Sequence, residues 1–590
     1  MSGRFARDMP FGATVLASGK TTFRLWAPGA TGVQVEVEGL PAAAMEAAKE
    51  KGWFERTLPC GAGAQYRFRV ANGLLVPDPA ARAQVADVHG ASLVVDPRAY
   101  TWKHPAWQGR PWTETVLYEL HAGACGGFAG VQALLPDLAR LGVTAVELMP
   151  VNDFPGARNW GYDGVLPFAP DRSYGSPDDL KALVDAAHGH GLMMFLDVVY
   201  NHFGPDGNYL AAYAPPFFRD DIATPWGAAI DFRSPYVRRF FTENALYWLQ
   251  EYRFDGLRFD AVHAISESDW LDEMAAEVRR TVEPGRHVHL VLEHDGNVAD
   301  HLRRDFDAQW NDDAHHVLHV LLTGQSDGYY ADYATEPVAR LARALEQGFV
   351  YQGEASIYRS GERRGTPSAD LAPTSFVFFL QNHDQVGNRP LGDRLTTLAD
   401  PQALEAAVAL QLLAPQIPLI FRGEEDGSET PFLFFTDHHG DLADAVREGR
   451  RREFAGFAGF APGQGIEQIP DPNERATFEQ SRPRPHPTRG HARSALYRRL
   501  LDLRARLLVP RLDGARAVAA TAVGPAAVIA RWRLGDGSRF VLAANLGRDD
   551  AACPAVDGDL KFESRAGAGR RLAGGTLPAA STVALLEQPP

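Results

Sequence analysis

The sequence predicts an α/β protein in which a (β/α)₈ TIM barrel is flanked by an N-terminal β-sandwich and a small C-terminal β domain. Three observations support this prediction. From residue 113 onward, continuous apolar runs alternate with amphipathic segments of helical period, which indicates a parallel sheet covered by helices. Before residue 95 and after residue 509, shorter runs alternate polar and apolar residues between Gly and Pro turns, as in antiparallel sheets. The 590 residues also suffice for two or three domains.

The N-terminal β-sandwich is expected over residues 1–95. Residues 22–26 and 65–70 alternate between apolar and polar side chains, so each run would place its apolar residues on one face of a strand. A linker over residues 96–112 is expected to lead into the barrel, which is assigned to residues 113–508 together with its insertions.

The barrel prediction rests on a series of apolar strands separated by helices. Strands are expected at 116–120, 145–149, 193–199, 254–263, 288–295, 306–308, 376–384 and 417–421. Helices are expected at 131–141, 178–190 and 492–508, and another begins at Ser234 and Pro235. Serine is a common N-cap residue, and proline suits the first helical position because it needs no hydrogen-bonded N–H there. A strand count close to eight favours a closed barrel over an open sheet.

The residue pattern changes twice in the last part of the chain. Residues 437–490 are rich in His, Arg, Pro and charge, and they are expected to form a long irregular excursion. Residues 527–532 and 539–544 return to β character between Gly-rich turns, so residues 509–590 are assigned to a C-terminal β domain.

Composition excludes several classes of protein. Hydrophobic residues make up 45% and charged residues 23% of the chain, which is typical of a soluble globular protein. The net charge of −15 argues against a nucleic-acid partner, which would require basic patches. Three widely spaced cysteines indicate neither a disulfide framework nor a cysteine metal site. Neither a signal peptide nor a membrane span is recognisable, so we expect a cytoplasmic protein without a membrane partner.

Arg258 and Asp260 lie two residues apart in the apolar segment 254–263. Side chains two residues apart on a strand point to the same side, so the guanidinium can keep the carboxylate ionised. For this segment alone, a structural ion pair and a prepared nucleophile are equally consistent with the pattern.

Two further apolar segments end in acidic residues. Glu293 closes the segment 288–295 and Asp384 closes the segment 376–384. Three strands that each carry an acid at their carboxyl end are the arrangement expected of a barrel enzyme that cleaves glycosidic bonds.

Cleavage of an acetal requires a proton donor for the leaving oxygen and a carboxylate that meets the positive charge at the anomeric carbon. Asp260 beside Arg258 is expected to have a lowered pKa, whereas burial of Glu293 at the end of an apolar strand would raise its pKa. His202 and His383 also stand at strand ends and are expected to bind sugar hydroxyls. Taken singly, such histidines are more often structural, but their joint position favours a function.

Four segments in this order resemble the four signature regions of the α-amylase superfamily: 197–202, 256–263, 292–295 and 379–384. The resemblance implies that Asp260 is the nucleophile, Glu293 the general acid/base and Asp384 the transition-state stabiliser. It also implies that His202, Arg258 and His383 surround the glucose unit at the cleaved bond. The superfamily reaction retains configuration through a covalent intermediate, for which the two reacting carboxyls lie about 5–5.5 Å apart.

Other segments resemble one group within the superfamily, the maltooligosyltrehalose trehalohydrolases. They are 77–82, 88–90, 160–164, 309–316, 328–333 and 431–438, and 23–28 looks like the β-sandwich module that precedes such barrels. The resemblance implies hydrolysis of the α-1,4 bond next to the α,α-1,1-linked end of maltooligosyltrehalose, which yields trehalose and a maltooligosaccharide.

Several more side chains are candidates for contacts with sugar. Tyr162 and Trp226 offer flat aromatic faces for a glucose ring, although core packing is the alternative for each. The other candidates are His263, the last residue of the segment 256–263, Gln385, which follows the segment 379–384, and the acids Asp312 and Glu424. Solvated loop acids are the commoner outcome for the last two.

We expect neither a metal nor another cofactor, because no loop dense in Asp and Asn supplies the six to eight oxygen ligands, roughly, that calcium requires. Two alternatives remain open. The first is a glucan branching or debranching enzyme that acts on α-1,6 linkages on the same scaffold. The second is a noncatalytic carbohydrate-binding protein, against which the three acids argue.

Overall fold

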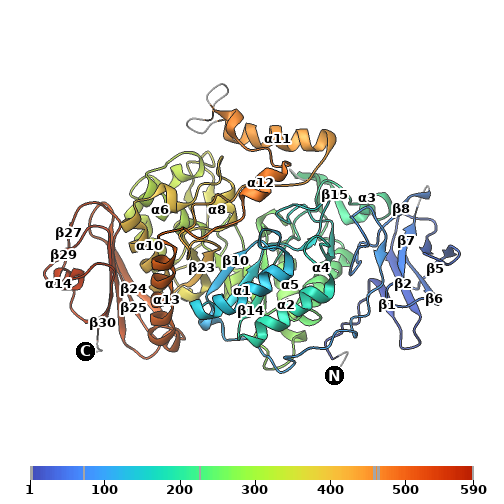
Figure 1. Cartoon of the computed structure of the whole chain (residues 1–590), viewed down its shortest axis with the longest axis horizontal. Coiled ribbons are helices and arrows are strands. Elements are labelled where there is room, and N and C mark those ends of the chain that lie inside the picture. Colours follow the sequence, from blue (N-terminus) through green and yellow to red (C-terminus); the bar gives the residue numbers. More distant parts are fainter. Residues whose placement is uncertain (1–3, 71–72, 225–226, 456–459, 461–464, 588–590) are drawn as a thin grey trace.

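The computed structural model describes residues 4–70, 73–224, 227–455, 460 and 465–587. A closed barrel occupies the centre, and a β domain lies at each end of the long axis (Figure 1). The predicted fold class is therefore confirmed.

The N-terminal domain is a sandwich of two antiparallel sheets. The first sheet has the order β1 (Gly12–Val15), β2 (Thr21–Trp26), β6 (Trp53–Leu58) and β5 (Glu46–Ala47). The second consists of β4 (Ala43–Ala44), β3 (Gln34–Val37), β7 (Gln65–Arg69) and β8 (Leu75–Val76), and β9 (Ser92–Leu93) also pairs with β7. Alternate residues such as Phe23, Val35 and Phe68 are fully buried, as the period-two pattern requires.

The barrel contains eight parallel strands in chain order, and the last strand pairs with the first. They are β10 (Leu117–Leu120), β11 (Ala145–Leu148), β14 (Met193–Val198), β17 (Gly256–Phe259), β18 (His289–Leu292), β19 (Ala308–Trp310), β22 (Phe376–Phe379) and β23 (Ile417–Phe421). Every residue of these strands is buried, because side chains fill the barrel on one face and helices cover the other. Seven of these strands lie within segments that the sequence predicts, whereas β19 shares only Ala308 with the predicted strand 306–308.

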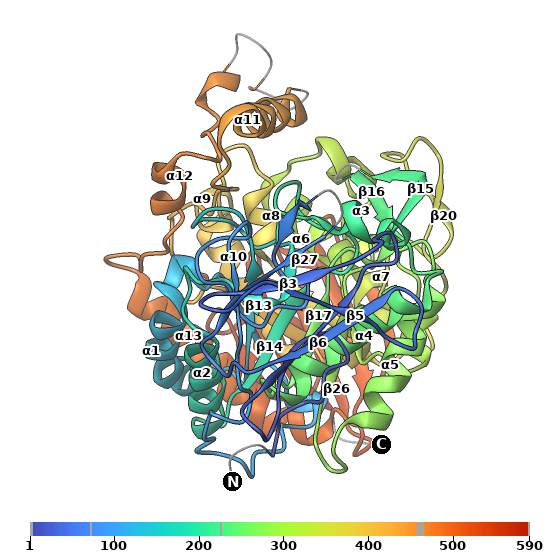
Figure 2. The same cartoon turned by 90° about the vertical axis from the view of Figure 1, so that its right-hand side faces the viewer.

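Helices surround this barrel (Figures 1 and 2). The longer ones are α1 (Gly127–Leu141), α2 (Pro177–Gly189), α4 (Pro235–Gln250), α5 (Asp269–Thr281), α6 (Asp312–Thr323), α7 (Pro337–Gln347), α10 (Pro401–Leu413) and α13 (Gly490–Leu507). Short helices are α3 (Leu210–Tyr213), α8 (His383–Gly387) and α9 (Leu395–Leu398). Ser234 occupies the N-cap position of α4, but its side chain makes no capping hydrogen bond; Pro235 is the first helical residue.

The prediction of an irregular excursion over residues 437–490 is wrong in part. Residues Gly440–Phe454 form helix α11 and Arg475–Gln480 form helix α12. Helix α11 projects from the barrel and buries only Phe454 of its own residues, so it shows no apolar stripe for a sequence to reveal (Figure 1). Ion pairs three residues apart, such as Arg447–Asp444 and Arg451–Glu448, support the helix instead.

The C-terminal domain contains a five-stranded antiparallel sheet. Its order is β24 (Arg516–Ala522), β25 (Ala527–Arg533), β26 (Arg539–Asn545), β30 (Ser581–Glu587) and β28 (Asp559–Glu563). Strands β27 (Ala551–Ala552) and β29 (Thr576–Leu577) form a second small sheet, and α14 (Ala568–Ala573) packs nearby. The Thr582 hydroxyl donates to the carbonyl of Ala406 in α10, which joins this domain to the barrel. The domain boundaries given above stay predictions.

No helix in the described part of the chain combines the length and the apolar character that crossing a membrane requires.

Candidate active site

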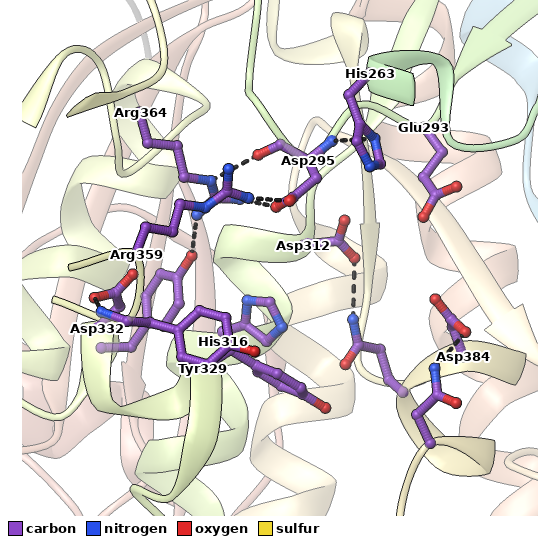
Figure 3. A pocket seen from close by; sticks show the side chains of 14 residues that line it. His263, Glu293, Asp295, Asp312, His316, Tyr329, Asp332, Arg359, Arg364 and Asp384 are labelled. Carbon is purple, nitrogen blue, oxygen red and sulfur yellow. Dashed lines mark hydrogen bonds and ion pairs between the residues drawn. The ribbon is translucent and has the colours of Figure 1, made fainter. Parts of the chain in front are cut away.

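The three acids of the signature segments meet at the carboxyl ends of β17, β18 and β22, as expected for side chains at one end of a parallel barrel. Glu293 and Asp384 line a cavity of about 300 Å³. Figure 3 places these two side chains on one side of the cavity and Arg359, Arg364 and Asp332 on the other.

Arg258 is the centre of the site. Its Nη1 donates to Asp197 at 2.6 Å and to Asp260 at 2.8 Å, and its Nη2 lies 2.8 Å from Glu293 Oε2. The guanidinium is buried and lies over the ring of Trp310, 4.3 Å from the centroid. One cation therefore holds three carboxyl groups that come from β14, the end of β17 and the end of β18.

The pKa of Asp260 lies below its usual range. Burial by itself raises that pKa, but the charges of Arg258 and His202 and a hydrogen bond from Asn201 lower it by more. Asn201 Nδ2 donates to Asp260 Oδ2 at 2.8 Å and to the Asp260 carbonyl at 2.9 Å. Asp260 is therefore an ionised carboxylate at neutral pH, held at both oxygens.

Burial raises the pKa of Glu293 to about 8, and the charges of Asp260 and Asp384 add to this effect although Arg258 opposes it. Its Oε2 also accepts from the Ala261 N–H at 2.7 Å. Ala261 has φ 40°, the left-handed conformation that non-glycine residues rarely adopt, and it follows Asp260 directly. The two acids thus have opposite pKa shifts, as the sequence predicts.

Asp384 is the second residue of α8 and is more exposed than the other two acids, with 38% of its side chain accessible. Its Oδ1 accepts a hydrogen bond from Asn388 Nδ2 at 2.7 Å. The next residue, Gln385, donates to Asp312 Oδ1 at 3.1 Å, and all four residues line the cavity.

His383 and Tyr162 belong to a buried network beside these acids. Glu119 of β10 accepts from the His383 backbone N–H at 2.9 Å and from Nδ1 at 2.5 Å. This contact raises the pKa of His383 to about 9 despite the opposing effect of burial. His383 Nε2 donates to the Tyr162 hydroxyl at 2.8 Å, which in turn donates to Asp197 at 2.6 Å.

The remaining sequence candidates divide into two groups. His202 lies beside Asn201 and 2.9 Å from the Tyr162 carbonyl, and His263 lines the cavity near Glu293. Glu424 lies elsewhere, because its oxygens accept from the Phe421 N–H at 2.9 Å and the Tyr497 hydroxyl at 3.4 Å among buried residues. The structure thus corrects the position expected for Glu424. Trp226 lies outside the described residues.

Sequence patterns do not reveal Arg359 and Arg364, which lie on the side of the cavity opposite Glu293 and Asp384 (Figure 3). Arg364 belongs to the short strand β21 (Arg363–Arg364), which pairs with β20 (Glu354–Ala355), and it lies 3.4 Å from Asp295 Oδ1. Arg359 also pairs with Asp295, and the exposed ring of Tyr358 lines the cavity beside it. A loop without apolar periodicity offers no pattern that would identify the two arginines or Tyr358, whereas Asp295 and Tyr329 lie in segments that stood out by resemblance.

The arrangement can carry out acid-assisted nucleophilic displacement. An ionised carboxylate and a protonated carboxyl share one guanidinium, which is the pair of protonation states that glycoside hydrolysis needs. In the described ranges, no cluster of three or more His, Cys, Asp or Glu side chains could hold a metal ion.

Family models match three parts of the chain. Residues 92–214 match the catalytic domain of alpha amylase, and residues 10–86 match carbohydrate-binding module 48, the isoamylase N-terminal domain. Residues 515–585 match a domain of unknown function.

Solved structures give the same architecture. A crystal structure described as a putative alpha amylase from Salmonella typhimurium has a TM-score of 0.92 at 43% identity and covers 99% of this chain and 100% of its own. A pullulanase from Anoxybacillus, solved with maltotetraose, has a TM-score of 0.70 at 19% identity over 99% and 88% of the two chains, which shows the fold alone.

Whole-chain relatives are more specific. The chain is 42% identical to the malto-oligosyltrehalose trehalohydrolase of Deinococcus radiodurans over 91% of both chains, and 39% identical to that of Saccharolobus solfataricus over 80% and 83%. A 1,4-alpha-glucan branching enzyme from Corynebacterium jeikeium is 36% identical over only 43% of this chain and 40% of its own. The barrel, its three-acid site and this identity over nearly the whole length show that the chain belongs to the malto-oligosyltrehalose trehalohydrolase family of α-amylase-type glycoside hydrolases.

Proposed function

We propose that the protein hydrolyses the α-1,4 bond next to the trehalose end of maltooligosyltrehalose, with retention of configuration. The observation that carries the proposal is the single guanidinium of Arg258, which contacts an ionised Asp260 and a protonated Glu293. The names of the whole-chain relatives supply the substrate class.

In the first step, the Asp260 carboxylate attacks the anomeric carbon while Glu293 gives its proton to the glycosidic oxygen. The bond between the maltooligosyl unit and trehalose breaks, and trehalose leaves with that proton. In the second step, the Glu293 carboxylate takes a proton from water, the water oxygen bonds to the anomeric carbon, and Asp260 departs as a carboxylate. Asp384 stabilises the positive ring in both transition states.

The lining of the cavity supports a trehalose leaving group. Asp295, Arg359 and Arg364 form a polar wall, and Tyr329 and Tyr358 also line the cavity. Guanidinium and carboxylate groups bind sugar hydroxyls, and tyrosine rings pack against the apolar faces of glucose. A wall of this composition suits a sugar leaving group such as trehalose.

Product analysis tests this proposal against α-1,6 activity. Maltotriosyltrehalose, amylose and pullulan are each incubated with the enzyme, and the products are separated by chromatography. We expect trehalose and maltotriose from the first substrate. Absence of trehalose would contradict the proposal, and new or cleaved α-1,6 branches would favour the branching or debranching alternative.

We further propose a cytoplasmic location. Cys60, Cys125 and Cys553 are all free thiols, which suits a reducing compartment. Fractionation of the producing cell, with activity assayed in each fraction, tests this expectation.

A further inference from the structure

Helix α11 projects from the barrel, yet its Arg450 contacts Asn388, a residue that lines the active-site cavity. In both views the helix stands beyond the end of the barrel that carries α8 (Figures 1 and 2). Only 9% of the Arg450 side chain is accessible, whereas most of the neighbouring arginines of α11 are more exposed.

Three kinds of contact hold the Arg450 guanidinium, of which one is an ion pair within α11 to Glu453 Oε2 at 2.9 Å. It lies over the rings of Phe434 and Phe454, 5.3 and 4.5 Å from their centroids. It also donates to the backbone carbonyl of Gly387, the last residue of α8, and to Asn388 Oδ1 at 3.1 Å. The guanidinium therefore binds the C-terminal end of α8, the short helix in which Asp384 is the second residue.

The contact with Asn388 fixes the direction of its amide group. A guanidinium can only donate hydrogen bonds, so the atom of Asn388 that faces Arg450 must be the oxygen. The amide NH₂ then faces the opposite way, where it donates to Asp384 Oδ1 at 2.7 Å. Arg450 and Asp384 thus hold the amide from its two ends, the guanidinium at the oxygen and the carboxylate at the NH₂. Without Arg450, the amide oxygen loses this donor, and Asn388 can move away from the position in which it meets Asp384.

We propose that Arg450 is a positioning residue that acts on Asp384 through Asn388. The inference rests on the proposed function, because it takes Asp384 as the transition-state stabiliser. This proposal also gives helix α11 a role, because the helix supplies the cation that holds the Asn388 amide against the Asp384 carboxylate.

Kinetics of Arg450→Met test this role. We expect kcat on maltotriosyltrehalose to fall by roughly 10-fold to 100-fold, because small misplacements of a reacting group are costly. KM should change little, since Asp384 acts mainly in the transition state. Arg450→Lys keeps a cation over the two aromatic rings but cannot donate to Gly387 and Asn388 in the same fork geometry. It should therefore also lose activity, whereas full rescue by lysine would overturn the inference.

A double variant separates positioning from general damage. If Arg450 acts through Asn388, then Arg450→Met adds almost nothing to the loss in kcat caused by Asn388→Leu. Losses that multiply would overturn the proposal. Arg451→Met is the matched control, because that neighbouring arginine forms an ion pair with Glu448 of the same helix; its kcat should stay within twofold.

The outcomes distinguish failure of the inference from failure of the proposed function. Asp384→Asn that retains the wild-type kcat would remove the role proposed for Asp384. An inactive Asp384→Asn with a fully active Arg450→Met would remove only the role of Arg450. All variants are compared after cooperative thermal unfolding has shown that they are folded.

Discussion

Glu119 binds both the backbone N–H and the Nδ1 of His383, although 264 residues separate them in sequence. Glu119 belongs to β10, the first strand of the barrel, and His383 is the first residue of α8, which follows the seventh strand, β22. Glu119 therefore fixes both the ring and the main chain of the residue that precedes Asp384. Its charge keeps His383 as an imidazolium.

Replacement of Glu119 by glutamine should remove a pH dependence of stability. The pKa of His383 rises from about 6.5 in the unfolded chain to about 9 in the folded protein, which contributes on the order of 3 kcal/mol. Because the pKa is raised on folding, protonated His383 contributes its full stabilisation of the folded protein below pH 6.5, and this contribution is lost as the pH rises through 9. Urea unfolding at several pH values should show this loss in the wild type and not in Glu119→Gln.

The pH profile should report Glu293 as the acid. Its pKa of about 8 means that kcat/KM falls as the pH rises through that value, because the proton donor is lost. Glu293→Gln should lower kcat about 10²–10⁴-fold and abolish the alkaline limb. An unchanged alkaline limb in this variant would assign the limb to another group.

Arg258→Met should be severe in both stability and activity. Removal of the cation leaves one buried carboxyl group, that of Asp197, and two half-buried ones, those of Asp260 and Glu293, without their cationic partner, at a cost of about 3–5 kcal/mol. The pKa of Asp260 should rise, so the acid limb of kcat/KM moves to higher pH. Arg303→Met is a suitable control, since Arg303 also pairs with two carboxylates, Asp300 and Asp370, but at the surface.

Ala261→Gly should raise the free energy of unfolding by about 0.5–1 kcal/mol. Glycine removes the strain of the left-handed conformation in the folded protein, and this gain exceeds the cost of the larger conformational entropy that glycine gives the unfolded chain. Ala261→Val should destabilise the protein. Ala245→Gly, within helix α4, is the opposite control and should cost about 0.5–1 kcal/mol. Equal effects at positions 261 and 245 would contradict the role of backbone strain.

Activity should survive chelation. Dialysis against EDTA is expected to leave kcat unchanged, because no step of the proposed reaction uses a metal ion. Loss of activity that calcium restores would contradict this expectation.

The strands and the three acids could be predicted because both follow from local patterns. Buried parallel strands are continuous apolar runs, and acids that follow them must gather at one end of the barrel. The pairing of Arg258 with Asp260 could be predicted from the period of a strand alone, because side chains two residues apart point to the same side.

Other features depend on contacts that a local pattern does not contain. Glu119 faces His383 only because the barrel closes, and Arg450 reaches Asn388 from a helix that is polar on nearly every side. Glu424 resembled a binding residue, but the turn after β23 folds it inward against Phe421 and Tyr497.

The pairing of β17 with β18 has a stereochemical consequence. Phe259 is opposite Leu292, so Asp260 and Glu293 continue the same register one residue further. Neighbouring strands lie about 4.7–4.9 Å apart, close to the roughly 5–5.5 Å that separates the carboxyls of retaining glycosidases. The register of two neighbouring strands therefore brings the backbones of the two acids close together, which favours the short carboxyl separation of a double displacement over the wider one that leaves room for a water molecule.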